Sequence, residues 1–415
     1  MSVIRVLSRL AGISLILMAG ASSVRADPEL TLTEAERLAL QHAPWLSHHR
    51  TNVAAMAERV TYEGRLPDPQ LTVGMVNVPT DTYRLDQEDM TMVNVGIRQA
   101  FPPGDTLKLR SRRAEKELSR EEARLEMERR NLLLQVRDAW LDLYFADESL
   151  RFLRESRQLA VRQRDAAEGR FRAAAVTQQE VLQAREELAR LDEREQDLRA
   201  QSERRRAQLA RWIGEPAYAP LPEAAPPLPD VPERFEPARH PEWIAAQAGL
   251  EEARLDVDIA RQEYRPGMTF DLSYGARQSR PDGQSRPDLV SAMVTFDLPI
   301  FRSKRQDRRL AEKQAMQAAA QFETEDRRRE LEARYRAVRA EHEALAARVK
   351  IYTERLLPDI EREARVTVSG FARDVTGLRE ARRKELEAKT ELVRLRVDLA
   401  KSQAELLYLI GEDMP

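Results

Sequence analysis

The chain contains no cysteine among its 415 residues, and aromatic side chains make up only 6% of it. Without cysteine it can have no disulfide framework, no thiolate metal site and no cysteine nucleophile. No stretch is apolar over the roughly 20 residues that a membrane-spanning helix requires. Any insertion into a membrane must therefore use strands.

The first 26 residues have the features of a secretory signal peptide. Arg5 and Arg9 precede the apolar run Leu10 to Ala21, and a small-residue cleavage site follows at Val24-Arg25-Ala26. We expect an exported protein whose mature chain begins near Asp27. A membrane anchor is the alternative, for which the run is too short. No cysteine is present at the new N-terminus to carry a lipid.

Removal of the three arginines in this segment leaves 65 basic and 70 acidic residues, a net charge near −5. This balance argues against nucleic-acid binding. Alanine, glutamate, arginine and leucine dominate, which is typical of long helices and coiled coils. No nucleotide-binding loop, metal-hydrolase motif or recognisable spacing of nucleophile, base and orienting group occurs. We therefore expect a protein that is not an enzyme and that binds no cofactor or metal.

An internal duplication is the most informative feature, because the chain can be aligned with itself at an offset of 197 residues. Phe101-Pro102 matches Leu298-Pro299, and Ile213-Gly214-Glu215 matches Ile410-Gly411-Glu412. We expect two structural repeats, 27–215 and 238–415. The segment 216–237, rich in proline and alanine, is predicted to be a stiff extended linker.

Each repeat is predicted to contain a short helix, a pair of strands and a long helical hairpin. Apolar and polar residues alternate from Met268 to Tyr274 and from Val290 to Leu298, over about the length that a tilted strand needs to cross a bilayer. The first repeat shows the same pattern more weakly. The predicted strand pairs occupy about 70–101 and 267–299, and polar loops with proline or glycine connect the strands.

Helical periodicity follows each strand pair, over about 104–213 and 302–410. Breakers appear only at Ala173 to Thr177 and at Ser369-Gly370, so we expect uninterrupted helices between the strands and these turns. A helix of about 70 residues is roughly 100 Å long. Leucines with seven-residue spacing in the returning helices predict coiled-coil arms. Trp45, Trp140 and Trp243 are expected to be core residues.

Four membrane strands cannot close a barrel, and open edges are not tolerated in lipid. Two chains would give eight strands, which side chains fill, whereas three would give twelve and leave a passage. The sequence therefore predicts an α+β membrane protein that is mostly α: a trimeric, twelve-stranded transmembrane barrel continued by a periplasmic helical tube.

The duplicated plan resembles the TolC family of outer-membrane efflux proteins over essentially the whole mature chain. The opening Leu30 to Ala35 with His42-Ala43-Pro44 is similar to that family's first helix. Arg170 to Ala184 and Val368 to Ala381 are similar to its two tip motifs, although alanine replaces the usual glycine at the first tip. The resemblance implies a passive homotrimeric channel in the outer membrane of a Gram-negative bacterium, extending into the periplasm.

The same resemblance implies two partners, a periplasmic adaptor protein and an inner-membrane resistance-nodulation-division (RND) pump. Leu66 to Leu71 and Met90 to Met92 are most similar to the heavy-metal cation branch, the CzcC and CusC type. Heavy-metal cations are thus the expected cargo. Drug efflux and type I protein secretion, the latter with an ABC transporter, are the first alternatives. A soluble periplasmic coiled-coil scaffold is the second.

Three groups of candidate site residues follow. The strand alternation places five polar residues on the expected lumen side: Thr269, Asp271, Ser273, Thr295 and Asp297. By analogy with the family, Arg170, Arg172, Arg373 and Asp374 at the two tips are candidates for a periplasmic gate. Tyr274 and Phe301 are expected at the membrane interfaces.

Two possible metal sites have simpler explanations. His42, His48 and His49 offer imidazole ligands, but adjacent histidines on a helix point to different sides and no carboxylate completes the site. Met75 could contact a soft ion such as Cu(I), but it falls on the apolar face of its strand, where lipid contact explains it.

Overall fold

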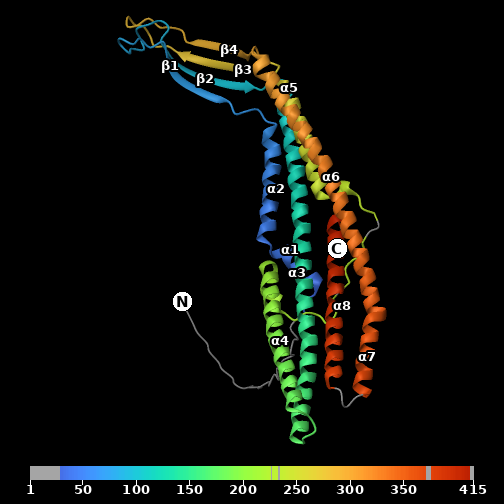
Figure 1. Cartoon of the computed structure of the whole chain (residues 1–415). Coiled ribbons are helices and arrows are strands. Elements are labelled where there is room, and N and C mark those ends of the chain that lie inside the picture. Colours follow the sequence, from blue (N-terminus) through green and yellow to red (C-terminus); the bar gives the residue numbers. More distant parts are fainter. Residues whose placement is uncertain (1–28, 226, 232–233, 371–374, 412–415) are drawn as a thin grey trace, which may run out of the picture.

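The structure is a computed structural model that describes residues 29–225, 227–231, 234–370 and 375–411. It is a long rod of helices with a small sheet at one end (Figure 1). The expected signal peptide and its cleavage site at Val24-Arg25-Ala26 lie outside the described residues. None of the described helices combines the length and the apolar character needed to cross a membrane.

The chain has two parts, each with a helix, two strands and then long helices. The first part contains α1 (Leu32–His42), α2 (Pro44–Glu63), β1 (Gln70–Val76), β2 (Met92–Phe101), α3 (Thr106–Arg172) and α4 (Gln178–Ile213). The second part contains α5 (Pro241–Gln262), β3 (Gly267–Ala276), β4 (Leu289–Asp297), α6 (Gln306–Ile351), α7 (Leu357–Gly370) and α8 (Val375–Ile410). Three short 3₁₀ turns lie at Glu215–Tyr218, Pro237–Arg239 and Arg302–Lys304.

The proline-rich segment between the two parts lies against the helices. The N–H of Leu30 donates to the carbonyl of Pro220 at 2.8 Å, and Ala217 is fully buried. The guanidinium of Arg206 donates to the carbonyls of Ala217 and Ala219 at 3.0 and 2.8 Å. The segment is therefore part of the packed structure.

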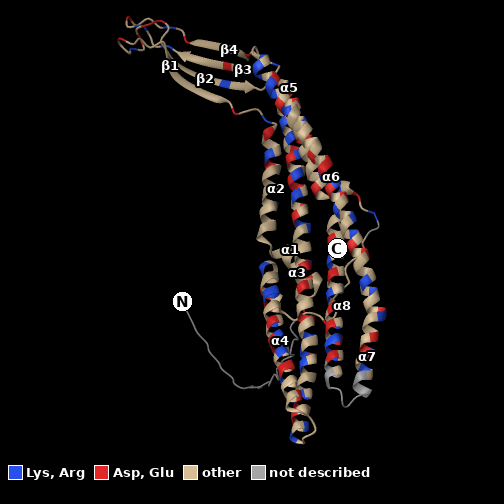
Figure 2. Cartoon of the chain, in the orientation of Figure 1, with Lys and Arg blue, Asp and Glu red and all other residues tan. Residues whose placement is uncertain are grey.

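Helix α3 is the longest element, and its 67 residues correspond to about 100 Å. It contains no proline, and its single glycine, Gly169, lies in the last turn, so no residue interrupts its backbone hydrogen bonds. Arginine and acidic side chains pair along its surface, as Arg130 does with Glu126 at 2.9 Å. Both signs of charge are distributed along all the helices, whereas the strands are almost free of charge (Figure 2).

The prediction of an uninterrupted helix up to Ser369 is wrong at Tyr352–Leu356, where a π-helical turn separates α6 from α7. Pro358 supplies the physical reason. It has no N–H to donate to the carbonyl of Glu354, and its ring crowds that carbonyl. A wider turn of the π type accommodates both effects.

The main hydrophobic core lies where α1 packs against α3 and α4, midway along the rod (Figure 1). Trp140 is fully buried there, its indole N–H donates to the carbonyl of Leu30 at 3.0 Å, and its ring stacks on Tyr144. Trp243 packs against a second cluster, around Tyr335. The expectation that Trp45 is a core residue is wrong, because 40% of its surface is exposed in the first turn of α2.

Ion pairs tie α2, α3, α5 and α6 together near the helix ends that adjoin the strands. Arg59 of α2 binds Glu117 of α3 at 3.0 Å, and Arg113 of α3 binds Asp256 of α5 at 2.7 Å. Lys313 of α6 reaches the same Asp256 at 3.6 Å. We call these five residues the ion-pair collar. It fixes the helices that deliver the four strands to the sheet.

His240 caps α5 from a buried position. Its Nδ1 accepts the N–H of Glu242 at 3.2 Å, so this nitrogen carries no proton, and the residue is 1% exposed. Burial, reinforced by the positive charges of Arg130 and Arg334, lowers the pKa of His240 from 6.5 to about 4. Protonation of this ring therefore opposes folding.

We expect the free energy of unfolding to fall by up to about 3 kcal/mol per chain as the pH drops from 6.5 towards 4, because the unfolded chain takes up this proton at a higher pH. The stabilisation is fully present above pH 6.5. The variant His240→Asn keeps a capping acceptor but does not titrate, so it should lack this component. Urea unfolding of both proteins at neutral and acidic pH measures the difference. Equal losses in the two proteins would contradict the assignment.

Candidate functional site

The four strands form one antiparallel sheet in the order β1-β2-β3-β4, so β1 and β4 are its edges. Directly paired residues project to the same face, and successive residues of a strand project to opposite faces. Val73, Val95, Tyr274 and Val290 lie opposite one another across the four strands and share one face. The register separates the sheet into an apolar face and a polar face.

The apolar face carries large side chains that the chain itself leaves uncovered. Leu71 and Met75 on β1 are 69% and 65% exposed, and Phe296 on β4 is 56% exposed. The exposed large apolar strand residues of this face are Leu71, Val73, Met75, Val93, Val95, Ile97, Met268, Phe270, Leu272, Tyr274, Val290, Val294 and Phe296. A patch of this kind marks a surface that contacts lipid or another protein.

The polar face contains all five residues predicted to line a lumen. Thr269 lies opposite Thr295, and Ser273 follows on β3. Asp271 projects between these two β3 residues, and Asp297 comes two residues after Thr295. The structure therefore brings the five side chains together on one surface.

An ion pair on the polar face is absent from the sequence prediction. Arg98 of β2 lies opposite Asp271 of β3, and its Nε donates to Oδ1 of Asp271 at 2.5 Å. The two residues are 173 positions apart in the chain. Periodicity assigns each of them to a face but gives no register between strands, so no sequence signal identifies the pair.

Tyr274 and Phe301, the predicted interface aromatics, lie towards opposite ends of the sheet. Tyr274 is near the loop end of β3, on the apolar face, and its hydroxyl donates to the carboxylate of Asp288. Phe301 follows β4 at the end that joins the helices and is 77% exposed.

The predicted gate residues Arg170 and Arg172 lie in the last turn of α3, at the end of the rod opposite the sheet (Figure 1). Arg373 and Asp374, the candidates at the second tip, lie outside the described residues. The structure thus places one of the two predicted pairs.

The turn between α3 and α4 is held by three features. Ala174 has a φ of 56°, in the left-handed region that glycine usually occupies. Thr177 and Glu180 form a capping box at the start of α4, a signature visible in the sequence. Arg185 of α4 binds Glu168 of α3 at 2.8 Å and closes the hairpin behind the turn.

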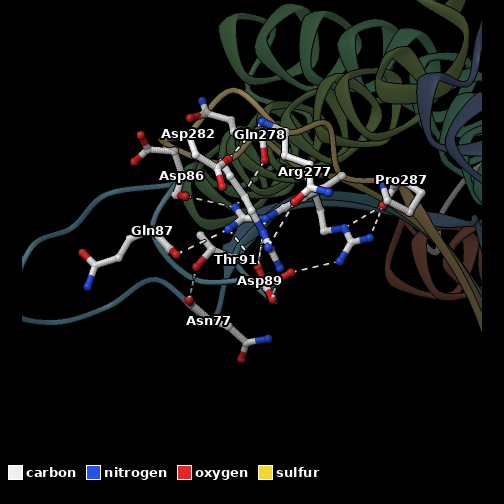
Figure 3. Close-up of polar contacts among 12 residues, drawn as sticks. Asn77, Asp86, Gln87, Asp89, Thr91, Arg277, Gln278, Asp282 and Pro287 are labelled. Atoms are coloured by element: carbon white, nitrogen blue, oxygen red, sulfur yellow. Dashed lines mark hydrogen bonds and ion pairs between the residues drawn. The ribbon is translucent and has the colours of Figure 1, made fainter.

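The two loops at the free end of the sheet, 77–91 and 277–288, are joined by a charged cluster (Figure 3). Arg280 binds the carboxylate of Asp89 through Nε and a terminal nitrogen, at 3.2 and 2.8 Å. Arg277 donates to the carbonyl of Asp89 at 3.0 Å. Hydrogen bonds from Arg280, together with the positive charges of Arg280 and Arg286, lower the pKa of Asp89. Desolvation of the carboxyl opposes this shift but is outweighed.

Arg286 is the centre of this cluster, which we call the loop clasp, and its side chain is 6% exposed. It binds the Asp89 carboxylate at 2.8 Å. It also donates to the carbonyls of Asp86 and Gln87 in the first loop and of Gln278 in the second, at 3.0, 3.4 and 3.3 Å. One guanidinium therefore links the loops of both strand pairs.

The candidate metal ligands are dispersed. The described residues include no group of three or more histidine, cysteine or acidic side chains placed to hold a metal ion. The His48 and His49 rings lie 5.4 Å apart on α2, and Met75 is on the exposed apolar face.

Comparison with known proteins identifies the family. The model of the family described as outer membrane efflux protein matches residues 36–215 and 237–412. The chain belongs to this family. Its members are transport conduits of the outer membrane. Protein CyaE of Bordetella pertussis (strain Tohama I) is 31% identical over 186 residues, which cover 41% of this chain and 38% of that protein's length.

Solved structures of the same fold extend over nearly the whole chain. A membrane protein from Pseudomonas aeruginosa has a TM-score of 0.76 at 17% identity, covering 94% of this chain and 98% of the other. CusC has a TM-score of 0.76 at 14% identity, covering 93% of each chain. VceC from Vibrio cholerae has a TM-score of 0.76 at 17% identity, covering 92% of this chain and 96% of the other. At these identities the likeness concerns the fold.

Loss of the Arg286 guanidinium should loosen both loops. In Arg286→Met we expect amide hydrogen exchange in 77–91 and 277–288 to rise about tenfold or more, because three carbonyls and a carboxylate lose a charged donor. Mass spectrometry of the purified protein measures the exchange.

Arg84→Met is the matched control. Arg84 lies in the first of the two loops, 77–91, and among the described residues it pairs with Asp86, two residues away, and with no residue of the second loop. It should leave exchange in 277–288 unchanged. An Arg286→Met protein with wild-type exchange in both loops would show that the clasp does not order them.

Proposed function

We propose that this chain is one of three identical subunits of a passive export channel in the outer membrane, working with a periplasmic adaptor and an inner-membrane RND pump. The single observation that carries the proposal is the sheet, in which the strand register collects most of the exposed large apolar side chains on one face and all the charged side chains on the other. A membrane barrel needs this division, because its outer surface contacts lipid and its inner surface contacts water.

The strand order supports assembly from several chains. β1 and β4 are edge strands of the described sheet, and their outer hydrogen-bonding groups point away from it. In lipid such groups must be paired, so β4 of one subunit would join β1 of the next. Three subunits give twelve strands and a water-filled passage. Mass measurement of the detergent-extracted particle distinguishes three chains from two.

The long helices would continue the barrel as a tube across the periplasm. α3 alone spans about 100 Å, and its tip carries Arg170 and Arg172 at the end of the rod. We propose these residues, with Arg373 and Asp374, as part of the periplasmic gate and Tyr274 and Phe301 as interface aromatics. The family model's two matched segments, 36–215 and 237–412, support an origin by duplication with repeats 27–215 and 238–415.

We propose heavy-metal cations as the cargo, on the resemblance of Leu66 to Leu71 and Met90 to Met92 to that branch of the family. A strain lacking this gene should be sensitive to one or more of copper, silver, zinc, cobalt and cadmium. Growth on a panel of these metals and of organic toxicants measures this. Sensitivity confined to organic compounds would contradict the metal cargo and favour drug export, and loss of a secreted protein alone would favour type I secretion.

The absence of cysteine allows a direct test of which face meets water. In intact cells a charged, water-soluble thiol reagent should label Ser273→Cys, on the polar face, and should not label Leu272→Cys, on the apolar face. Carboxylates and hydroxyls on one side and large apolar groups on the other are the physical reason. Mass spectrometry measures the labelled fraction.

Labelling of the same variants after denaturation is the control, and both must then react. The two positions are adjacent in β3, so a difference between them reports the face and not the depth. Labelling of both variants in cells would support the soluble scaffold instead. Labelling of Leu272→Cys alone would show that the apolar face, and not the polar face, meets water.

A further inference from the structure

The sheet contains three charged side chains, and they are not equivalent. Among the residues of β1 to β4 these are Arg98, Asp271 and Asp297, and the register places all three on the polar face. Arg98 and Asp271 lie directly opposite each other and are joined at 2.5 Å. Their charges cancel locally, which leaves Asp297 to determine the net charge of this face.

Asp297 is exposed and has no charged partner among the described residues. It lies opposite Gly267, and a Cβ added at Gly267 would approach Oδ2 of Asp297 to 3.1 Å. The missing side chain at Gly267 therefore leaves the carboxylate uncovered. In the described part of the chain, no lysine, arginine or histidine nitrogen comes within 4.0 Å of it. Each chain thus contributes one uncompensated negative charge to the polar face.

We propose that Asp297 makes the barrel segment prefer cations. Three copies, one from each subunit, form a ring of carboxylates where the barrel meets the helical tube, and the three Arg98–Asp271 pairs add no net charge. This inference rests on the proposed function, because it needs the polar faces of three chains to surround a water-filled lumen. A ring of charges of one sign between low-dielectric walls raises the local concentration of counter-ions and excludes co-ions. The favoured solutes are metal ions and organic cations alike.

Thr269 provides a reporter position for the local potential. It lies on β3 between Gly267 and Asp271 on the same face, opposite Thr295, so it is a near neighbour of both acidic side chains. The full-length Thr269→Cys protein, in intact cells, is treated with a trimethylammonium thiosulfonate or with a sulfonate thiosulfonate. The ratio of the two reaction rates reports the charge around this position.

The ion pair predicts that the cation-to-anion rate ratio changes in opposite directions in the two single variants. Asp297→Asn should lower the cation-to-anion rate ratio about threefold, as expected for removal of a unit charge roughly 7 Å away in salt water. Arg98→Gln should raise the ratio by a similar factor, because it frees the charge of Asp271. The double variant Arg98→Gln, Asp271→Asn should return the ratio to that of Thr269→Cys alone.

The outcomes separate the inference from the proposed function. If neither reagent labels Thr269→Cys in cells while both label it after denaturation, the polar face does not line a lumen and the proposed function fails. If both reagents react and Asp297→Asn leaves the ratio unchanged, the lumen stands and the carboxylate ring is overturned. Asp297→Glu keeps the charge and should keep the ratio. A lowered ratio in Asp297→Glu would trace the effect to altered structure and overturn the assignment.

Discussion

Unpaired backbone groups on the outer edges of β1 and β4 are the constraint on which the rest of the structure depends. An apolar sheet face is stable only against lipid or protein, and in lipid every edge N–H and C=O needs a partner. A single four-stranded sheet meets neither condition. The proposed assembly meets both, because copies of the chain would pair one another's edge strands.

Charged contacts outside the strands make this arrangement possible. At one end the ion-pair collar fixes the helices that enter the sheet, and at the other the loop clasp joins the two loops through Arg286. The strands themselves then need few polar contacts. Only Arg98, Asp271 and Asp297 carry charge within them, and the apolar face carries none.

The sequence predicts strand positions and faces because the side-chain period of a strand is two, and that pattern survives in β3 and β4. Seven-residue spacing likewise predicts buried seam residues such as Leu188 and Leu395. Contacts between distant segments, such as Arg98 with Asp271 and the loop clasp, depend on register and loop conformation, which no local pattern encodes. Pro358 is a visible signal for the π turn, but the helical periodicity on both sides masks it.

The π turn keeps the buried side chains of α6 and α7 on one face of the continuous helix. Buried and half-buried residues follow alternating steps of four and three along α6 and then a single step of five: Leu331, Tyr335, Val338, His342, Leu345, Val349, Tyr352, Leu357, Ile360 and Ala364. With an ordinary turn the following helix would rotate by about 100°. Asp359 and Glu363 would then take the inward places of Ile360 and Ala364. The π turn thus accommodates one extra residue, and the buried residues before and after it lie on one continuous face of the helix.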